Sequence, residues 1–396
     1  MYDGLTDPLG QSQVLPYMKG LSKNYQIDIL GFEKEKSFKN QKLNIKNKLI
    51  GYDINWIPLK YTKNPPIFST IYDFLRAWVL ITKLSRQENY NLIHCRSSAV
   101  GPLALMLQKR LKSKLLFDMR GWWADEKKES GNWASFIYVP IYKFYKLIEK
   151  KLFKSSDIAI SLTHAGAKEI SSANLKEDFK TFIIPTCVDF KVFKKFDETI
   201  RLEVRKELEI GFSETVLLYS GSLGGNYSMD IIFGFYKSLK RYKKNLKILF
   251  LTKDEQQMVH NEARDSGIDI SNIRVISSSY DKVHRYLMAG DFGFVNYLKT
   301  FSAIGRSPTK LGEYWACGLP VIGQKNIGDL DYLLDRYPLS GLLINKIDKK
   351  SFDEVTDKIK NLNFDKELLR EYSRDYYDLN KGIKSYEKVY ETILAN

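Results

Sequence analysis

The chain has 396 residues, of which 44% are hydrophobic and 28% charged, so it is long enough for two globular domains with real cores. Its net charge is +15, and residues 1–190 hold most of the excess, with 29 Lys and Arg against 18 Asp and Glu. This basic half favours an anionic partner, and we prefer anionic lipid to nucleic acid because no zinc-finger spacing or RNA-recognition signature is present. We see no signal peptide and no apolar run long enough to span a bilayer.

The residues that most often bind metals are scattered along the chain. They form no metal-ligand pattern and no disulfide framework, which favours a reducing compartment. His94 ends a predicted strand, where a position at the rim of a site and a buried, hydrogen-bonded position are both open. The residues are Cys95, Cys187, Cys317, His94, His164, His260 and His284.

Short apolar runs typical of buried strands alternate with helix-like segments along the first half of the chain. Before the first of them, Met1–Leu5 begins almost at a loop, whereas an α/β domain of this kind normally opens with a full hydrophobic strand. We expect either a very short strand there or a start that lies within a longer reading frame. The predicted strands are Gln26–Phe32, Asn91–Cys95, Lys114–Met119, Asp157–Leu162 and Phe182–Pro185.

The segment Asp7–Tyr17 (DPLGQSQVLPY) is typical of a tight loop that opens a helix. Gly10 has no side chain, so its backbone can approach a ligand closely. The N–H groups of Gln11 and the two residues after it would then face the cleft between the two domains. A simple turn is the alternative interpretation.

Several charged residues follow the predicted strand at Lys114–Met119. The carboxyl ends of parallel strands are where ligands bind in such sheets, so Asp118 and Arg120 are expected at the rim of the site. Asp125 and Glu126 offer carboxylates to hydroxyl groups, although both are equally consistent with solvated residues beside two lysines.

An aromatic, lysine-rich segment covers Trp133–Phe153. One helical face carries apolar residues and lysines surround the rest, which fits either a helix lying on a membrane or a core helix with a solvated back. A second candidate is Thr70–Leu84. The apolar face comprises Ile141, Phe144, Tyr145, Ile148 and Leu152, and the lysines are Lys143, Lys146, Lys150, Lys151 and Lys154.

The second half repeats the alternation of strands and helices. Two such sets predict two Rossmann-like domains with parallel sheets, divided near Lys191–Thr199, with a final helix near Ile383–Leu394. The domains are therefore 1–190, 191–378 and a C-terminal helix at 379–396 that packs on the first domain. The strands are Thr215–Ser220, Leu246–Leu251, Ile273–Ser277, Phe292–Tyr297, Pro320–Gly323 and Leu342–Ile344.

A glycine-containing loop, Tyr219–Tyr227 (YSGSLGGNY), follows the first strand of this half. Its small residues, among them Gly221 and Ser222, would let backbone amides surround a phosphate, and a flexible connection is the alternative. Further on, Val275 and Ser277 lie where backbone groups could recognise a nucleotide base.

The most informative stretch is Ser307–Ile322 (SPTKLGEYWACGLPVI), which predicts a helix start, one short helix and a buried strand. Ser307 is expected to cap a helix whose free N–H groups and dipole favour an anion. Thr309 adds a hydroxyl and Lys310 a positive charge. Glu313, one turn after Thr309, would be free to accept hydrogen bonds from a ribose, so the stretch indicates a nucleotide site.

These residues resemble the donor-site motif of glycosyltransferase family 4, retaining enzymes of the GT-B fold. That motif has two Glu separated by seven residues within a run such as E-A-M-A-C-G-L-P-V-I. Glu313 matches the second Glu, but Gly305 stands at the position of the first, which removes one expected contact to the donor sugar. The run resembles a subgroup with S-P-T-K-x-x-E-Y, and the resemblance extends over nearly the whole chain.

The resemblance implies a GT-B, α/β fold and transfer of a sugar from a nucleotide-sugar to a hydroxyl of a glycan or polyprenyl-diphosphate-linked acceptor, with retention of configuration and without metal or other cofactor. It places the enzyme in bacterial polysaccharide or glycolipid biosynthesis, cytoplasmic and peripheral on the inner membrane face. The alternatives are a GT-B sugar-nucleotide epimerase and a non-catalytic membrane or nucleic-acid binding protein. The expected catalytic residues are Lys310, Glu313 and Arg120, the donor-binding residues Gly10, Gln11, Gly221, Ser222, Val275, Ser277, Ser307, Thr309 and Leu311, and the acceptor-binding residues Asp125 and Glu126.

Overall fold

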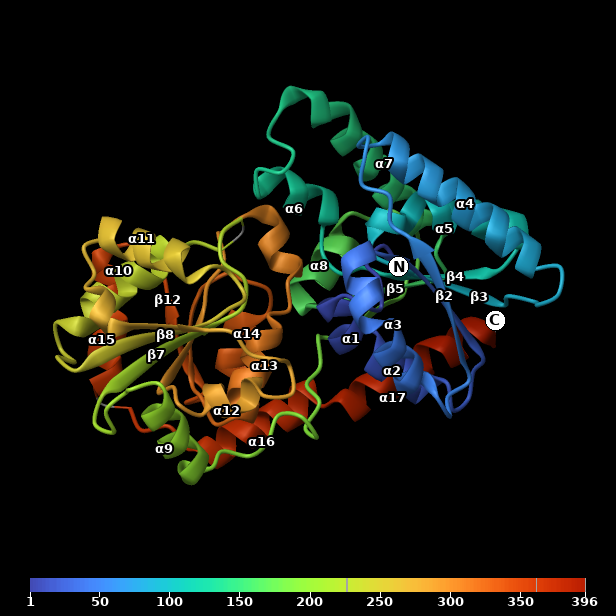
Figure 1. The fold of residues 1–396 in the computed structure, drawn as a ribbon. Coiled ribbons are helices and arrows are strands. Elements are labelled where there is room, and N and C mark those ends of the chain that lie inside the picture. The colour runs from blue at the N-terminus through green and yellow to red at the C-terminus, as the bar shows by residue number, and fades with distance from the viewer. Residues whose placement is uncertain (226, 361, 396) are drawn as a thin grey trace. The chain divides into compact units, whose positions relative to one another are not determined.

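A computed structural model describes residues 1–225, 227–360 and 362–395 (Figure 1). It divides into two compact units, each built on parallel strands. Unit 1 comprises Met1–Pro185 and Leu379–Asn396, and unit 2 comprises Thr186–Asp378. The α/β class with parallel sheets is therefore confirmed, and the C-terminal helix belongs to the same unit as the first half of the chain.

The strands of unit 1 form two separate parallel sheets. One pairs β1 with β2, and the other has the order β3-β4-β5-β6. The strand β2 is not among the predicted strands, because its apolar residues are interrupted by Pro58 and by polar side chains. The strands are β1 (Ile27–Glu33), β2 (Ile54–Lys60), β3 (Leu92–Arg96), β4 (Lys114–Asp118), β5 (Ile158–Ser161) and β6 (Thr181–Ile183).

Helices cover these strands, and the last helix of the chain is one of them. A Cβ added to Gly20 of α2 would lie 2.6 Å from Ile383 of α17, so the glycine lets these two helices pack closely. The helices of unit 1 are α1 (Pro8–Gln13), α2 (Leu15–Leu21), α3 (Glu35–Leu49), α4 (Phe68–Leu84), α5 (Gly101–Leu111), α6 (Trp123–Glu129), α7 (Val139–Ser155), α8 (His164–Ser172) and α17 (Leu379–Leu394).

Unit 2 holds one parallel sheet with the strand order β12-β11-β10-β7-β8-β9. From β7 the chain builds outward through β8 and β9, and it then returns to build outward on the other side through β10, β11 and β12. The order therefore reverses between β7 and β10, and ligands of such sheets bind beyond the carboxyl ends of the strands at that point. The strands are β7 (Thr215–Ser220), β8 (Leu246–Leu251), β9 (Ile273–Ile276), β10 (Phe292–Val295), β11 (Val321–Gln324) and β12 (Gly341–Ile344).

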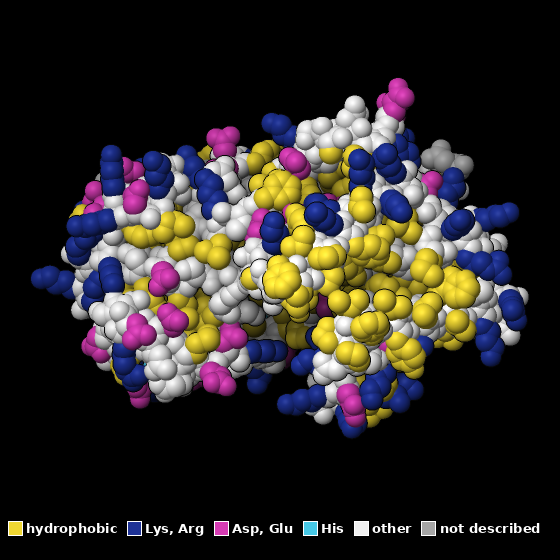
Figure 2. All heavy atoms as spheres, turned by 90° about the horizontal axis from the view of Figure 1, so that it is seen from above, with side chains coloured by type: hydrophobic (Ala, Val, Ile, Leu, Met, Phe, Trp, Pro, Cys, Tyr) yellow, Lys and Arg dark blue, Asp and Glu magenta, His cyan; other side chains and the backbone are white. Residues whose placement is uncertain are grey.

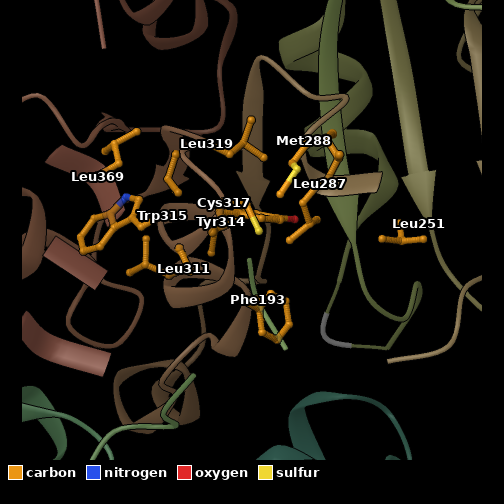
Figure 3. Close-up of a cluster of buried hydrophobic side chains, with 14 of the residues drawn as sticks. Phe193, Leu251, Leu287, Met288, Leu311, Tyr314, Trp315, Cys317, Leu319 and Leu369 are labelled. Atoms are coloured by element: carbon orange, nitrogen blue, oxygen red, sulfur yellow. The ribbon is translucent and has the colours of Figure 1, made fainter. Parts of the chain in front are cut away.

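Two apolar clusters lie on the faces of this sheet. Figure 3 shows one of them, in which Leu311, Tyr314 and Trp315 of a single short helix lie among buried leucines. The helices of unit 2 are α9 (Glu198–Glu207), α10 (Met229–Lys240), α11 (Gln256–Asp265), α12 (Val283–Leu287), α13 (Thr309–Ala316), α14 (Leu330–Arg336), α15 (Lys349–Lys360) and α16 (Lys366–Tyr377).

Candidate functional site

The helix α13 carries the motif that the sequence singled out. It begins at Thr309 after Pro308, and Ser307 lies one residue too early to cap it, so the predicted cap is wrong. The Ser307 hydroxyl instead accepts a hydrogen bond from the Thr186 N–H at 3.3 Å. The end of the helix is as predicted, because Gly318 takes a positive φ of 72° that suits glycine after a helix.

Buried contacts fix α13 at the carboxyl end of β7. The Ser220 N–H, at the end of that strand, donates to the Tyr314 hydroxyl at 2.8 Å. A Cβ on Gly293 of β10 would lie 2.3 Å from the Tyr314 ring, so only a glycine lets the ring cross that strand. The motif helix is thereby held over the two strands at which the sheet order reverses.

Lys310 projects from the first turn of α13 into an aromatic enclosure. Its Nζ lies 4.2 Å from the ring centre of Tyr219, 4.8 Å from that of Tyr227 and 5.7 Å from that of Tyr297. Tyr219 belongs to β7 and Tyr297 follows β10. The side chain is 8% exposed, and among the described residues its ammonium finds no hydrogen-bond acceptor.

This environment makes the charge of Lys310 unusually dependent on a ligand. Burial lowers its pKa from 10.5 to about 7, and nearby Glu313 only partly opposes that shift. Burial likewise raises the pKa of Glu313 from 4.5 to about 7, against the attraction of Lys310. Cation–π contacts partly stabilise the ammonium but leave its three N–H donors without hydrogen bonds. An anion placed there could therefore accept hydrogen bonds from all three.

The loop after β7 approaches the same lysine. Gly221 has a φ of 130°, and a Cβ added to it would lie 2.9 Å from the Lys310 Nζ. Ser222 directs its carbonyl oxygen inward, where it accepts a hydrogen bond from the Tyr219 hydroxyl at 2.6 Å. Asn226 of this predicted phosphate loop lies outside the described residues.

The aromatic enclosure and a second cation beside it were not predicted from the sequence. Arg306 is buried, and its guanidinium carbon lies 5.4 Å from the ring centre of Tyr297. It also donates to the Ser302 hydroxyl at 3.1 Å. Tyr219 and Tyr297 could have been found from their places at the ends of two predicted strands, but the fold of the loops that bring Tyr227 and Arg306 to them has no local signal.

The other residues of unit 2 that were predicted to bind the nucleotide-sugar donor differ in their solvent exposure. Leu311 is fully buried and its N–H donates to the Pro308 carbonyl at 2.9 Å, so the prediction of ligand contact is wrong for this residue. Val275 lies half-buried in the edge strand β9, and Ser277 follows that strand as an exposed residue. Thr309 is the first residue of α13 and is half-buried.

Gly10 and Gln11 lie in the short helix α1, not in an open loop. A Cβ on Gly10 would lie 2.3 Å from the Gly4 carbonyl oxygen, so the glycine is explained by packing inside unit 1. The Gln11 N–H donates to the Asp7 carbonyl at 3.1 Å. The prediction of free amides at this position is therefore wrong for Gln11, because the helix uses that amide itself.

Arg120 belongs to a buried cluster around Asp118, at the end of β4. Asp118 receives hydrogen bonds from Tyr386 of α17 at 2.9 Å and from Arg96 at 3.3 Å, and Arg120 lies 3.6 Å from it. Burial alone would raise the pKa of Asp118, but Arg120, His94 and Arg96 hold it well below its usual range. Arg120 therefore already has an anionic partner.

His94 is held between two partners and matches the hydrogen-bonded alternative. One ring nitrogen lies 2.8 Å from the Tyr390 hydroxyl of α17, and the other lies 3.3 Å from Asp118. The C-terminal helix is thus bound to the ends of β3 and β4 through polar contacts of two tyrosines.

Asp125 and Glu126, predicted to bind an acceptor, lie in α6. Asp125 is buried and accepts hydrogen bonds from Lys146 at 2.7 Å and from the Tyr142 hydroxyl at 2.8 Å. Its carboxylate is therefore used to join α6 to α7. Glu126 is half-buried in the same helix turn.

Among the described residues, no group of three His, Cys, Asp or Glu side chains is placed to hold a metal ion. Cys95, Cys187 and Cys317 are buried and carry free thiols. None of the helices in the described part of the chain is both long and apolar enough to cross a membrane.

No family model and no curated protein matches the chain, whereas solved structures match it over nearly its whole length. HepE of Anabaena, solved in complex with UDP-glucose, is 12% identical with a TM-score of 0.71, over 99% of this chain and 98% of its own. WaaG, a glycosyltransferase involved in lipopolysaccharide biosynthesis, is 16% identical with a TM-score of 0.67, over 99% and 98%.

A putative UDP-N-acetylglucosamine 2-epimerase from Listeria monocytogenes is also similar, at 14% identity and a TM-score of 0.57, over 97% of this chain and 92% of its own. Likeness at such low identity concerns the fold alone. The chain therefore has the fold of GT-B glycosyltransferases, with two Rossmann-like units.

Proposed function

We propose that this chain is a glycosyltransferase similar to family 4, which moves a sugar from a nucleotide-sugar to a hydroxyl group with retention of configuration. The observation that carries the proposal is Lys310, a buried cation without a hydrogen-bond acceptor among the described residues, at the point where the sheet order of unit 2 reverses. A diphosphate supplies the missing acceptors and charge. HepE, whose structure contains UDP-glucose, has the same fold.

In the proposed reaction the leaving group is the nucleoside diphosphate. The acceptor hydroxyl attacks the anomeric carbon from the side of the departing oxygen, the bond from that carbon to the diphosphate breaks, and the hydroxyl proton passes to a diphosphate oxygen. Lys310 stabilises the negative charge that develops on the diphosphate, and Glu313 accepts hydrogen bonds from the ribose. The contribution of the protein is positioning and electrostatic stabilisation, and no divalent metal or protein nucleophile takes part.

The proposed acceptor is a glycan or a polyprenyl-diphosphate-linked sugar at the cytoplasmic face of the membrane. Support comes from an exposed apolar stripe on α4 of unit 1, whose members recur at helical spacing while the opposite face of the helix is buried. Figure 2 shows hydrophobic side chains gathered with Lys and Arg over this face of unit 1. The stripe comprises Phe68, Ile71, Tyr72, Leu75 and Val79.

The helix α7 adds a second exposed apolar set. Its predicted apolar face is mostly core, since Tyr145, Ile148 and Leu152 are buried, so that face matches the core-helix alternative. Leu147 of α7 lies outside that core, and so does Phe136, which precedes the helix in a short 3-10 turn and is 82% exposed. The lysines left exposed around them are Lys143, Lys150, Lys151 and Lys154. Apolar residues with basic neighbours suit the interface of an anionic membrane.

A second candidate function is epimerisation of a sugar nucleotide, favoured by the similarity to the putative epimerase. It would use the same nucleotide site but needs no acceptor. The two functions therefore predict the same binding and different products.

The test has two stages. Thermal unfolding with UDP, GDP, UMP and uridine should show a rise in Tm for one diphosphate and little for the nucleoside, because a ligand of the native state stabilises it. Incubation with the matching sugar nucleotides, with and without lipid-linked acceptors, then separates transfer from epimerisation or hydrolysis. Absence of a shift with every nucleoside diphosphate would contradict the proposal.

A further inference from the structure

The carboxyl ends of β3 and β4 bring two arginines of unit 1 together. Arg96 is the last residue of β3 and lies opposite Asp118, the last residue of β4, and Arg120 follows two residues later. Both guanidinium groups donate to the side-chain oxygen of Gln13, Arg96 at 3.2 Å and Arg120 at 3.4 Å. Their side chains are 16% and 11% exposed. The two guanidinium groups are therefore adjacent and largely withdrawn from water, at the edge where parallel sheets bind ligands.

A single carboxylate is shared by these two cations. The Oδ2 atom of Asp118 accepts hydrogen bonds from Arg96 at 3.3 Å and from Tyr386 at 2.9 Å, and Arg120 lies 3.6 Å from Oδ1. Among the described residues, Asp118 is the one carboxylate that forms an ion pair with Arg96. Burial and the repulsion of Arg120 lower the pKa of Arg96 in spite of this partner. One carboxylate cannot neutralise two guanidinium groups, so the cluster carries an excess of positive charge.

Arg96 also keeps unused hydrogen-bond donors. A guanidinium has five N–H groups. Among the described residues Arg96 uses two of them, one to Asp118 and one to Gln13. Because a guanidinium stays charged at physiological pH, Arg96 cannot relieve its burial by losing a proton. An oxyanion would match both its charge and its remaining donors, since paired oxygens fit the planar group.

The backbone next to Arg96 is held in a strained conformation. Ser97 has a φ of 74° and a ψ of 146°, which residues with a side chain rarely adopt. Its N–H donates to the Asp118 carbonyl at 2.9 Å, and its hydroxyl accepts a hydrogen bond from the Ala99 N–H at 3.3 Å. Strain of this kind concentrates at binding and catalytic sites. The turn that orients Arg96 therefore has the character of a binding site.

We propose that Arg96 and Arg120 together bind an oxyanion, a phosphate or a carboxylate, which the sugar acceptor carries. Identifying the ligand as the acceptor rests on the proposed function, whereas the anion site itself rests on unit 1 alone. A neutral glycan would leave the excess charge of the cluster uncompensated, so the acceptor is a sugar phosphate or an acidic glycan. The charge excess of residues 1–190 attracts such a molecule.

Calorimetry tests this site on protein saturated with the nucleoside diphosphate that it binds, so that the Lys310 site is occupied. The probes are glucose 1-phosphate, glucuronate and glucose, which share a sugar ring and differ in charge. At least one anionic probe should bind about tenfold or more tightly than glucose. Arg96→Gln should weaken that binding by about tenfold or more, and Arg110→Gln, a change of an exposed arginine of α5, should leave it unchanged. The anionic probe that binds identifies the group as phosphate or carboxylate.

The Tm separates a binding role of Arg96 from a structural one. In Arg96→Gln the Asp118 carboxylate keeps Arg120, His94 and Tyr386 beside it, so Tm should change by no more than about 2 °C. A fall of about 5 °C or more with unchanged affinity for the probes would show that Arg96 only stabilises the carboxylate, and would overturn the proposal. If Arg96→Gln does not fold, Arg96→Lys, which keeps the charge but loses the planar group, should weaken binding by about threefold or more.

Equal affinity for the three probes would also overturn the proposal, as would equal effects of Arg96→Gln and Arg110→Gln. The rise in Tm with the nucleoside diphosphate is measured on the same variants, and a retained rise with lost binding of the anionic probe assigns the defect to unit 1. If the wild type shows no rise with any nucleoside diphosphate, the proposed function fails. The probes are then measured in Lys310→Met, where the competing cation is absent, so the anion site is judged separately.

Discussion

Lys310 is the residue on which the proposed transfer depends most. Lys310→Met should lower turnover by about 10²-fold or more, the loss typical of a preorganised electrostatic group. The Tm of the free protein should stay unchanged or rise, because methionine fills the aromatic enclosure without a charge that burial disfavours. The matched control is Lys299→Met. Lys299 is an exposed lysine that follows β10, and its replacement should leave both the turnover and the Tm unchanged. If turnover falls only a few-fold, stabilisation of the leaving diphosphate would be assigned to Arg306 instead.

The pH dependence of UDP binding should report the same lysine. Its pKa is about 7 in the free protein, and a bound diphosphate favours the charged form, so binding above pH 7 takes up a proton. Affinity should therefore fall as pH rises above 7, by up to about tenfold per pH unit until the pKa of the complex is reached. The slope should vanish in Lys310→Met and persist in Glu313→Gln.

The free protein should show the opposite trend. Between pH 7 and 10.5 the unfolded chain holds the Lys310 proton and the folded chain does not, so the contribution of this residue to the free energy of unfolding rises with pH. A titration in which binding and stability change in the same direction over this range would contradict the assignment.

Glu313 is predicted to contact the ribose, and a pair of ligands isolates that contact. Glu313→Ala should weaken UDP binding by about tenfold or more, as expected for a hydrogen bond to a carboxylate, with little change in Tm. The Glu313→Ala variant and the wild type should bind 2′,3′-dideoxy-UDP equally weakly. This ligand lacks the ribose hydroxyls that would donate hydrogen bonds to the Glu313 carboxylate. Calorimetry of both ligands on both proteins completes the cycle. Equal losses for the two ligands would place Glu313 elsewhere.

At the scale of elements, α17 depends on the Asp118 cluster. Tyr386→Phe removes the 2.9 Å hydrogen bond to a buried carboxylate, and the free energy of unfolding should fall by about 1.5–3 kcal/mol. Tyr372→Phe is the control, since that half-buried tyrosine of α16 faces apolar and aromatic residues. Urea unfolding measures both. An equal effect of the two variants would show that the hydroxyl of Tyr386 contributes nothing specific.

The prediction of strands succeeded where the sequence holds one uninterrupted apolar run. Thr215–Ser220 and Leu246–Leu251 are found with the predicted bounds, because each is a short continuous apolar run between polar segments. β2 was missed because Pro58 and polar residues interrupt its pattern. The same holds around the candidate site. The motif alone singled out Lys310, and its place there stays a prediction, whereas Tyr227 and Arg306 lie near it through loops whose paths depend on tertiary contacts.

Two errors at the site have local causes. Gly10 was interpreted as permitting a ligand, but the group that approaches it is the backbone of Gly4. Leu311 stands within a motif that was expected to bind the donor, yet at helical spacing it falls on the core side of α13. A motif read as a string does not distinguish its exposed from its buried members, which only the packing of the helix decides.

At the scale of the molecule, the charge excess of residues 1–190 and the exposed apolar residues of α4 and α7 lie in the same unit. Either feature alone has an ordinary explanation, since solvated lysines and single surface apolar residues are common. Together they favour reversible docking on an anionic membrane. Each basic group near such a surface contributes about 1 kcal/mol and loses that contribution beyond a Debye length.

Vesicle co-sedimentation tests this docking. Binding should require anionic lipid, weaken with salt, and fall at least about tenfold when Lys143, Lys150, Lys151 and Lys154 are changed together to Gln, since these four are exposed. Lys146 is left intact because it pairs with Asp125 and Glu149 inside unit 1. The matched control changes the exposed Lys243 and Lys244 of unit 2, with unchanged binding expected.

The apolar part of the docking is tested separately by Leu75→Ser together with Val79→Ser on α4. Both side chains are at least half exposed, so Tm should change little, while binding to anionic vesicles should weaken and its salt dependence should remain. The lysine variant should show the reverse, with residual binding that no longer responds to salt. Equal binding of the wild type to neutral and anionic vesicles, or no binding to either, would instead indicate a soluble acceptor and a stripe that faces another protein.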